Sequence, residues 1–374
     1  MCRVLSSVMS VTARPVVYTG DIFRQQERGG ITRVFVEIAR RLSRPVFVVA
    51  GLHRSCDLSE LKGRVRWAGP RPRFRGDRVL LAPLDRLVDA LGLPRRGAIL
   101  HPTYYRAPRS LPPGTPWVVT VHDMTHERFP ELFPHRWWSR DPARHKAALC
   151  ARAARIVCYS ESARRDVIER LPVAEARVRV IPLAGREWNG IPSAAIPGVQ
   201  NPFALWVGER HTYKNWERTL EALATSPAGR DLGVLCVGGG GFAPGERAHL
   251  ERLGLSDRVI QRAAGDAELK WAYERASALL YTSLWEGFGL PVLEALALGC
   301  PVLCSDRASL PIVGGDAAVY ADPTDLDALR HGIAVVLADD RSPNRVAARR
   351  AQAARFSWDA TAEAYERLYQ ELDP

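Results

Sequence analysis

A chain of 374 residues, with 47% hydrophobic and 25% charged residues, is long enough for two globular domains that each have a core. It contains no apolar run of about 18 residues, which excludes a predicted membrane-spanning helix. The net charge of +11 is uneven: residues 1–200 hold 34 Lys and Arg against 17 Asp and Glu, whereas residues 201–374 hold 18 against 24. A basic half suits nucleic acid, an anionic substrate or an anionic membrane surface.

The seven cysteines are scattered and show no zinc-binding spacing, so we expect them to be reduced and mostly buried. The first eight residues are too polar for the core of a signal peptide. These two features predict a cytoplasmic protein.

The first half alternates strand-like and helix-like segments. We expect strands at residues 16–19, 46–50, 98–101, 117–121 and 156–159, and a helix at 31–42, where apolar residues recur at helical spacing. Residues 20–30 are expected to form a loop in which Gly29 and Gly30 let the backbone approach an anion closely. This alternation predicts a doubly wound α/β domain.

Polar side chains follow the strand at 117–121. His122 and Asp123 would lie at its carboxyl end, where open α/β sheets bind ligands. Together with His126 they could ligate a metal, but a useful site needs further ligands and an orienting outer shell. The competing interpretation is a loop histidine that bonds to the backbone, and we predict no metal site.

A domain boundary is expected where periodicity is lost and prolines gather, between residues 185 and 202. The change in the sign of the charge coincides with it. We therefore assign residues 1–190 to the N-terminal domain, 191–201 to a linker, 202–355 to a second domain and 356–374 to a terminal helix.

The second domain restarts with a strand at 203–207, which is followed by Arg210 and, at the head of a helix, Lys214. Lys214 can offer a point charge to a diphosphate and Arg210 a forked one. The alternative is that Lys214 and Arg210 are solvated and bind nothing. The helix dipole disfavours this alternative, because it prefers acidic residues near a helix start. Residues 238–243 loosely fit a dinucleotide-binding pattern, so an NAD-dependent oxidoreductase stays open, although no acidic residue follows at the required distance.

Residues 283–299 carry the strongest signal. A strand at 278–281 leads into a loop with Gly287 and Gly289, and the loop leads into a helix. Unpaired N–H groups and the positive helix end suit an anionic or polyoxygenated ligand. Glu286 and Glu294 can accept hydrogen bonds from its hydroxyl groups, which points to a sugar. The structural alternative is that these glycines only mark the start of a helix and bind nothing.

Several motifs together resemble the retaining glycosyltransferases of family 4. The matching stretches are residues 25–31, 101–105, 120–124, 159–162, 206–215, 286–294 and 356–358. The resemblance implies an α/β GT-B fold of two facing Rossmann-like domains, with a C-terminal helix that packs back on the N-terminal domain. It is closest to bacterial transferases that build lipopolysaccharide and other surface glycans, many of which use GDP-mannose.

The resemblance implies roles for the loop that contains Gly287 and Gly289, called the central loop here, and for the helix after it. Glu294 would hold the donor ribose and Glu286 a sugar hydroxyl. The backbone amides of Phe288 and Gly289 would also bind the sugar, and Leu290 is counted with these donor-binding residues.

The resemblance also implies which residues bind the diphosphate of the donor. Lys214 and Arg210 would neutralise it, and Gly29 and Gly30 would close on it from the other domain. Many relatives carry Arg directly before the lysine, whereas this chain carries Tyr213, so the placing of Arg210 departs from the family pattern.

The implied catalytic residues are His122, which would contact the donor sugar near its reacting carbon, Glu286 and Lys214. The expected reaction moves a hexose, with mannose favoured, from a nucleoside diphosphate sugar such as GDP-mannose to a glycan or lipid-linked hydroxyl, with retention. Stabilising the leaving diphosphate would be the largest contribution. No cofactor or metal is expected, because the bases can do this work.

Alternatives to this reaction are a sugar-nucleotide epimerase of the same fold, the oxidoreductase, a glycosidase and a nucleic-acid binder. Two carboxylates suit a glycosidase, but hydrolysis gives Lys214 and Arg210 no task. We predict no nucleic-acid partner.

A membrane contact is expected near residues 136–140, where paired tryptophans lie among bases and Arg144, His145 and Lys146 follow. Such a composition is typical of an interfacial anchor. The alternative places both tryptophans in the core. The first interpretation predicts peripheral attachment at the inner face of the cytoplasmic membrane.

Overall fold

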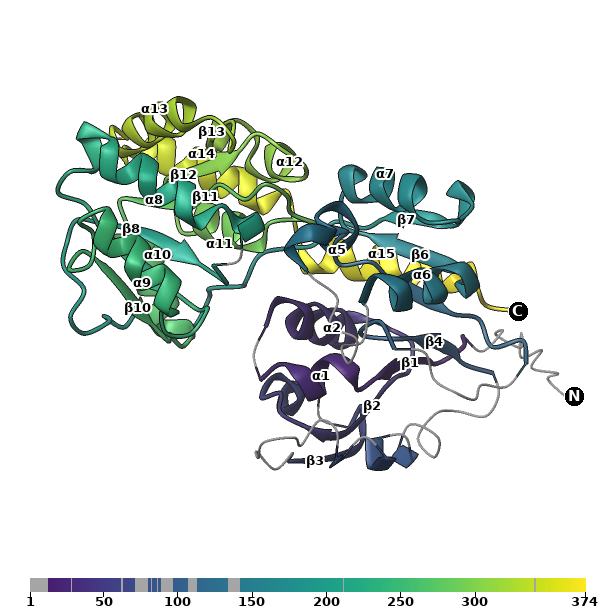
Figure 1. The fold of residues 1–374 in the computed structure, drawn as a ribbon. Coiled ribbons are helices and arrows are strands. Elements are labelled where there is room, and N and C mark those ends of the chain that lie inside the picture. Colours follow the sequence, from purple (N-terminus) through teal and green to yellow (C-terminus); the bar gives the residue numbers. More distant parts are fainter. Residues whose placement is uncertain are drawn as a thin grey trace, which may run out of the picture.

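The computed structural model describes residues 13–27, 29–61, 63–70, 80–81, 83–85, 87–88, 97–106, 113–133, 142–210, 212–339 and 341–374. These residues form two α/β domains, and the C-terminal helix runs from the second back to the first (Figure 1). Within the described ranges, no helix has the length and apolar character needed to cross a membrane.

The N-terminal sheet is parallel throughout. Its first part has the order β3-β2-β1-β4, with β1 (Val16–Thr19), β2 (Val46–His53), β3 (Val65–Pro70) and β4 (Ile99–His101). Its second part has the order β5-β6-β7, with β5 (Val118–Thr120), β6 (Arg155–Cys158) and β7 (Val178–Val180). A parallel bridge between Leu100 and Trp117 connects the two parts. The predicted doubly wound domain is confirmed.

The N-terminal helices connect these strands. In the part of the domain that the structure describes they are α1 (Asp21–Gln25), α2 (Gly30–Arg41), α5 (Thr125–Arg128), α6 (Pro142–Arg152) and α7 (Glu161–Arg170). The prediction of a loop over residues 20–30 is wrong at α1. Ile22 and Phe23 are 1% and 0% exposed, and their burial in the core stabilises a helix too short to show periodicity.

The C-terminal sheet has the parallel order β10-β9-β8-β11-β12-β13. Its strands are β8 (Phe203–Val207), β9 (Gly233–Val237), β10 (Val259–Arg262), β11 (Ala278–Tyr281), β12 (Val302–Ser305) and β13 (Val319–Ala321). The chain reverses its direction of travel across the sheet between β8 and β11. In open α/β sheets such a switch point is where ligands bind, outside the carboxyl ends of the strands.

Seven helices among the described residues surround this sheet: α8 (Trp216–Thr225), α9 (Pro244–Arg252), α10 (Asp266–Arg275), α11 (Leu290–Ala297), α12 (Leu310–Gly314), α13 (Leu326–Leu337) and α14 (Pro343–Ala354). Short 3-10 helices occur at Asp57–Glu60, Pro130–Leu132, Glu175–Arg177, Thr212–Lys214, Pro227–Gly229 and Gly315–Ala317. Between β7 and β8 the chain has neither helix nor strand.

The last helix, α15 (Trp358–Gln370), packs on the N-terminal domain beside α2, as predicted (Figure 1, yellow). Its Tyr365 and Tyr369 are fully buried. The Tyr369 hydroxyl lies 2.7 Å from His101 Nδ1, and the Tyr365 hydroxyl 3.1 Å from Thr120 Oγ1. Because buried hydroxyls and ring nitrogens are costly without partners, this polar cluster fixes where the helix docks.

Acidic side chains from the C-terminal helix and the residues after it pair with the basic N-terminal domain. Arg44, whose side chain is 0% exposed, lies 2.8 Å from Glu366 and 3.2 Å from Asp373. Glu371 lies 2.7 Å from Arg155. Part of the charge difference between the two halves is therefore used in holding them together.

Candidate active site

Lys214 and Glu286 meet at the switch point of the C-terminal sheet. Lys214 ends the short 3-10 helix after β8, and Glu286 lies in the loop after β11. The Lys214 Nζ is 2.6 Å from Glu286 Oε1, and the two side chains are 14% and 11% exposed. Burial alone would lower the pKa of Lys214, but the Glu286 carboxylate outweighs it and holds that pKa well above its usual value. The switch point of this sheet thus contains a fixed ammonium.

The residues of the loop before α11 are mostly buried, and its apolar side chain packs inward. Phe288 is 6% exposed and packs edge-on against Phe356 at a centroid distance of 5.7 Å. Ser309 Oγ donates to the carbonyls of Glu286 and Phe288 at 3.1 and 2.6 Å. Gly289 has a φ of 113°, and a Cβ there would lie 2.7 Å from Leu310 Cδ2, so only glycine fits.

Glu294 lies one turn into α11 and is 8% exposed. Its Oε2 accepts a hydrogen bond from the Tyr273 hydroxyl at 3.0 Å, and its Oε1 is 3.7 Å from Arg186 Nε. Burial raises the pKa of Glu294, while Arg186 and Tyr273 act to lower it. Sequence reasoning missed both neighbours, because Arg186 lies in the aperiodic connection and Tyr273 is indistinguishable from a core residue of α10.

Arg210 bonds to a different set of groups from Lys214. Its Nε is 2.6 Å from Glu246 Oε1, and its guanidinium donates to the carbonyls of Gly238 and Gly240 at 3.1 and 2.9 Å. The side chain is 2% exposed. Here Arg210 organises the glycine-rich turn after β9, and a diphosphate would have to compete for it. That turn presents carbonyls to a cation, whereas a dinucleotide loop presents N–H groups to a pyrophosphate.

His122 follows β5 and is 7% exposed. Its Nδ1 is 2.8 Å from the Tyr159 hydroxyl and its Nε2 is 3.3 Å from the Thr103 carbonyl. With the proton on Nε2, the ring donates to Thr103 and accepts from Tyr159. Burial lowers the pKa of His122 to about 4, so the ring is neutral at pH 7. Within the described ranges, no group of three His, Cys, Asp or Glu could hold a metal ion.

The two domains touch at His122 and the central loop. A Cβ on Gly287 would lie 2.1 Å from the His122 carbonyl oxygen, so the close approach requires glycine. Ser160, which caps α7, donates to the Gly287 carbonyl at 2.9 Å. The Arg128 guanidinium lies 3.7 Å from the centroid of the Trp285 ring, a cation–π contact across the domains. His122 and the loop that carries Glu286 are thereby brought together.

Gly29 and Gly30 lie at the start of α2, on the N-terminal side of this contact between the two domains, which we call the seam. Gly29 precedes the helix in an extended conformation and, as a glycine, has no side chain with which to cap it. A Cβ on Gly30 would lie 3.4 Å from Leu290 Cδ1, at the first residue of α11. The starts of α2 and α11 therefore meet, and both helix dipoles contribute positive potential to the seam.

Comparison with known proteins decides the family. Residues 28–184 match the family described as Glycosyltransferase Family 4, and residues 195–353 match Glycosyl transferases group 1. The chain is 30% identical over 256 residues to O-antigen chain mannosyltransferase B of Escherichia coli, across 65% of this chain and 67% of that relative. The chain is a family 4 glycosyltransferase. The predicted resemblance and hexosyltransferase class are confirmed.

Other relatives of this glycosyltransferase support the same assignment. It is 28% identical over 283 residues to the MMP alpha-(1->4)-mannosyltransferase of Mycolicibacterium hassiacum, across 69% of this chain and 66% of the relative. The sucrose-phosphate synthase structure from Thermosynechococcus elongatus superposes with a TM-score of 0.70 at 20% identity, covering 96% and 99% of the two chains. This likeness shows that the folds agree and confirms the GT-B prediction. The class implies a nucleotide-sugar donor and an acceptor.

Proposed function

We propose that this glycosyltransferase moves a mannosyl group from a nucleoside diphosphate sugar, GDP-mannose first, to a glycan or lipid-linked hydroxyl in the synthesis of a bacterial surface polysaccharide or glycolipid, with retention. The names of two relatives support mannose as the sugar. The observation that carries the proposal is the Lys214–Glu286 pair at the switch point, next to the start of α11.

Lys214 is the proposed partner of the donor's diphosphate. An ammonium has three donors, so Lys214 can hold Glu286 and phosphate oxygens together. As the sugar–oxygen bond breaks, negative charge collects on the leaving diphosphate, which the ammonium and the starts of α11 and α2 stabilise. Glu286 then accepts a hydrogen bond from a sugar hydroxyl, and Glu294 from the ribose.

His122 suits a contact with the donor sugar because its ring is neutral. Its pKa of about 4 leaves an uncharged imidazole at pH 7. The transition state of glycosyl transfer resembles an oxocarbenium ion, and a cationic imidazole beside it would repel the developing positive charge. A neutral ring beside the loop of Glu286 avoids this cost.

A thermal-shift screen tests the donor. GDP, UDP and ADP, with their mannose and glucose derivatives, would be added to wild type and Lys214→Ala. A ligand at 100 times its Kd stabilises by about 2.7 kcal/mol. We expect GDP and GDP-mannose to raise Tm most, and Lys214→Ala to lose the response to GDP while keeping the response to guanosine. If no nucleoside diphosphate shifts Tm, the proposal fails.

The acceptor side includes a proposed contact with anionic membranes. Residues 136–140, on which the predicted anchor depends, lie outside the described residues. The prediction that Lys146 belongs to that anchor is wrong. Its side chain is 0% exposed, and its Nζ donates to the Asp123 carbonyl at 2.7 Å and to Glu127 at 2.8 Å. It therefore braces the turn after β5, and it cannot face a lipid surface.

Liposome flotation tests this contact. Attachment to anionic vesicles should exceed attachment to neutral ones and should weaken with salt, since each surface base contributes about 1 kcal/mol and is screened within roughly 10 Å at 0.1 M salt. Equal attachment to both kinds of vesicle would favour a soluble acceptor.

A further inference from the structure

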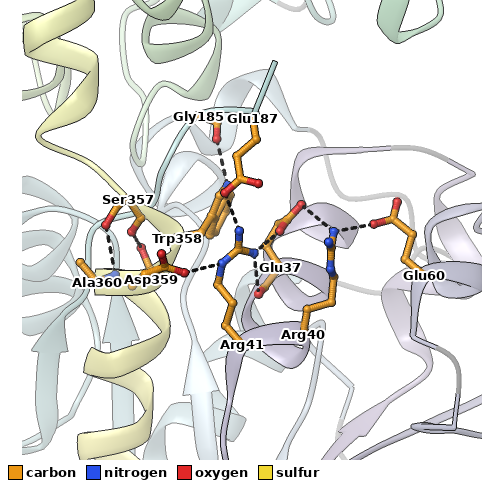
Figure 2. Close-up of polar contacts among 11 residues, drawn as sticks. Glu37, Arg40, Arg41, Glu60, Gly185, Glu187, Ser357, Trp358, Asp359 and Ala360 are labelled. Atoms are coloured by element: carbon orange, nitrogen blue, oxygen red, sulfur yellow. Dashed lines mark hydrogen bonds and ion pairs between the residues drawn. The ribbon is translucent and has the colours of Figure 1, made fainter. Parts of the chain in front are cut away.

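Residues 185–187 lie between β7 and β8 and contact both α2 and the C-terminal helix α15. The Gly185 carbonyl accepts a hydrogen bond from Trp358 Nε1 at 2.9 Å. The Glu187 carboxylate lies 2.5 Å from Arg41, and Arg41 Nε donates to Asp359 at 2.9 Å (Figure 2). The end of α2 and the start of α15 thus hold this segment from one side.

Arg186, between these two anchored residues, contacts the C-terminal domain. It pairs with Asp266 at the start of α10, and its Nε lies 3.7 Å from Glu294 Oε1. The side chain is 12% exposed, and its Nε is buried without a hydrogen-bond acceptor in the described structure. A buried cation from the interdomain connection is therefore placed against the carboxylate proposed to hold the ribose.

The surroundings of Glu294 show why a cation matters there. Two groups on α10, Asp266 and the Tyr273 hydroxyl, face it, together with Arg33 from α2 and Arg186. Burial favours the protonated carboxyl, and Arg186 is the largest influence that favours the charged form. A protonated carboxyl has less acceptor capacity for ribose hydroxyls, so the contact with Arg186 preserves the binding form.

We propose that Arg186 is a positioning residue of the donor site, which orients Glu294 toward the sugar nucleotide, and that Arg41 fixes the segment that carries it. The inference rests on the proposed role of Glu294 at the ribose. It makes donor affinity depend on the contacts of residues 185 and 187 with the end of α2 and the start of α15, neither of which is among the proposed donor-binding residues. A purely structural Arg186 would join the domains and leave nucleotide affinity unchanged.

The test compares Arg186→Ala, Arg186→Lys and Arg41→Ala with Arg367→Ala, whose side chain is 68% exposed on α15. The affinities for GDP and for guanosine would be measured by calorimetry from pH 5 to 8, with thermal unfolding alongside. Arg186→Ala should lower both affinities about tenfold at pH 7, as expected for one contact between charged groups. Lysine should restore most of the loss, Arg41→Ala should give a smaller loss, and Arg367→Ala none.

The pH profile and a double variant separate positioning from a structural role. Without Arg186 the pKa of Glu294 rises further, so the pH below which GDP binding fails should move upward. In a Glu294→Gln background, Arg186→Ala should cost little further affinity, because the two residues act together.

A variant Arg186→Ala that unfolds earlier but binds GDP as tightly as wild type, with the same pH profile, would overturn the inference and leave the proposed function intact. A wild-type protein that binds no nucleoside diphosphate would instead refute the proposed function and this inference with it.

Discussion

Replacing Lys214 with methionine removes the ammonium from the buried pair but keeps the length of the side chain. In wild type, Lys214 Nζ and Glu286 Oε1 are 2.6 Å apart, and both side chains are less than 15% exposed. The substitution leaves the Glu286 carboxylate buried without its ion-pair partner. The hydroxyl of Tyr281, 3.4 Å from Nζ, is too weak a donor to replace a charge.

The cost follows from this burial. Breaking one side of a buried ion pair destabilises a protein by roughly 3–5 kcal/mol, whereas replacing both sides with apolar groups is often neutral. In a domain of about 150–250 residues, each kcal/mol shifts Tm by roughly 2–4 °C. We therefore expect Lys214→Met to lower Tm by roughly 10 °C, and the double variant Lys214→Met/Glu286→Leu to recover most of the loss.

Calorimetric unfolding and a donor-hydrolysis assay together separate stability from function. Both the single and the double variant should lack turnover, because each lacks the cation proposed to neutralise the diphosphate. Recovered stability without recovered activity would show that the pair is kept for chemistry. An unchanged Tm in Lys214→Met, or a double variant as unstable as the single one, would refute the reasoning.

Three further predictions concern the seam, acid stability and metals. Gly287→Ala should obstruct the contact with the His122 carbonyl, lower kcat and enlarge the radius of gyration in small-angle scattering; unchanged values of both would contradict it. Between pH 6.5 and about 4 the unfolded chain protonates His122 and the folded protein does not, so stability should rise with pH by about 3 kcal/mol across this window. His122→Gln should show a shallower dependence of Tm on pH, and identical slopes would exclude this cause. Activity should survive EDTA, since Lys214 can neutralise the diphosphate without a metal ion. The two carboxylates of Asp325-Leu326-Asp327 have a spacing that could suit a metal ion, but Asp325 caps α13. Loss of activity that magnesium restores would refute this prediction.

The elements that could be predicted from sequence are those with a local cause. The strand at 278–281, the loop after it and the helix with Glu294 follow from a short apolar run, glycines and helix-start residues. The same signals placed Lys214 near a helix start and His122 at a strand end. The arrangement into two facing Rossmann-like domains came from the family resemblance, and no local signal gave the order of the strands in each sheet.

The features that sequence reasoning missed depend on distant contacts. Arg210 is held by carbonyls about 30 positions away, and Lys146 is buried by a carbonyl and a carboxylate from another element. Arg186 lies in a segment without periodicity, and its importance appears only when α11 is folded against it. Charge and residue type identified these side chains as bases, but they could not show what each base contacts.

The most direct measurement follows hydrolysis of an α-linked nucleoside diphosphate mannose by proton NMR, in the presence of wild type and of Glu286→Ala. We expect wild type to release α-mannose first, before mutarotation, and Glu286→Ala, although folded, to release none. First release of the β-anomer would contradict retention, and release by Glu286→Ala at the wild-type rate would contradict the site.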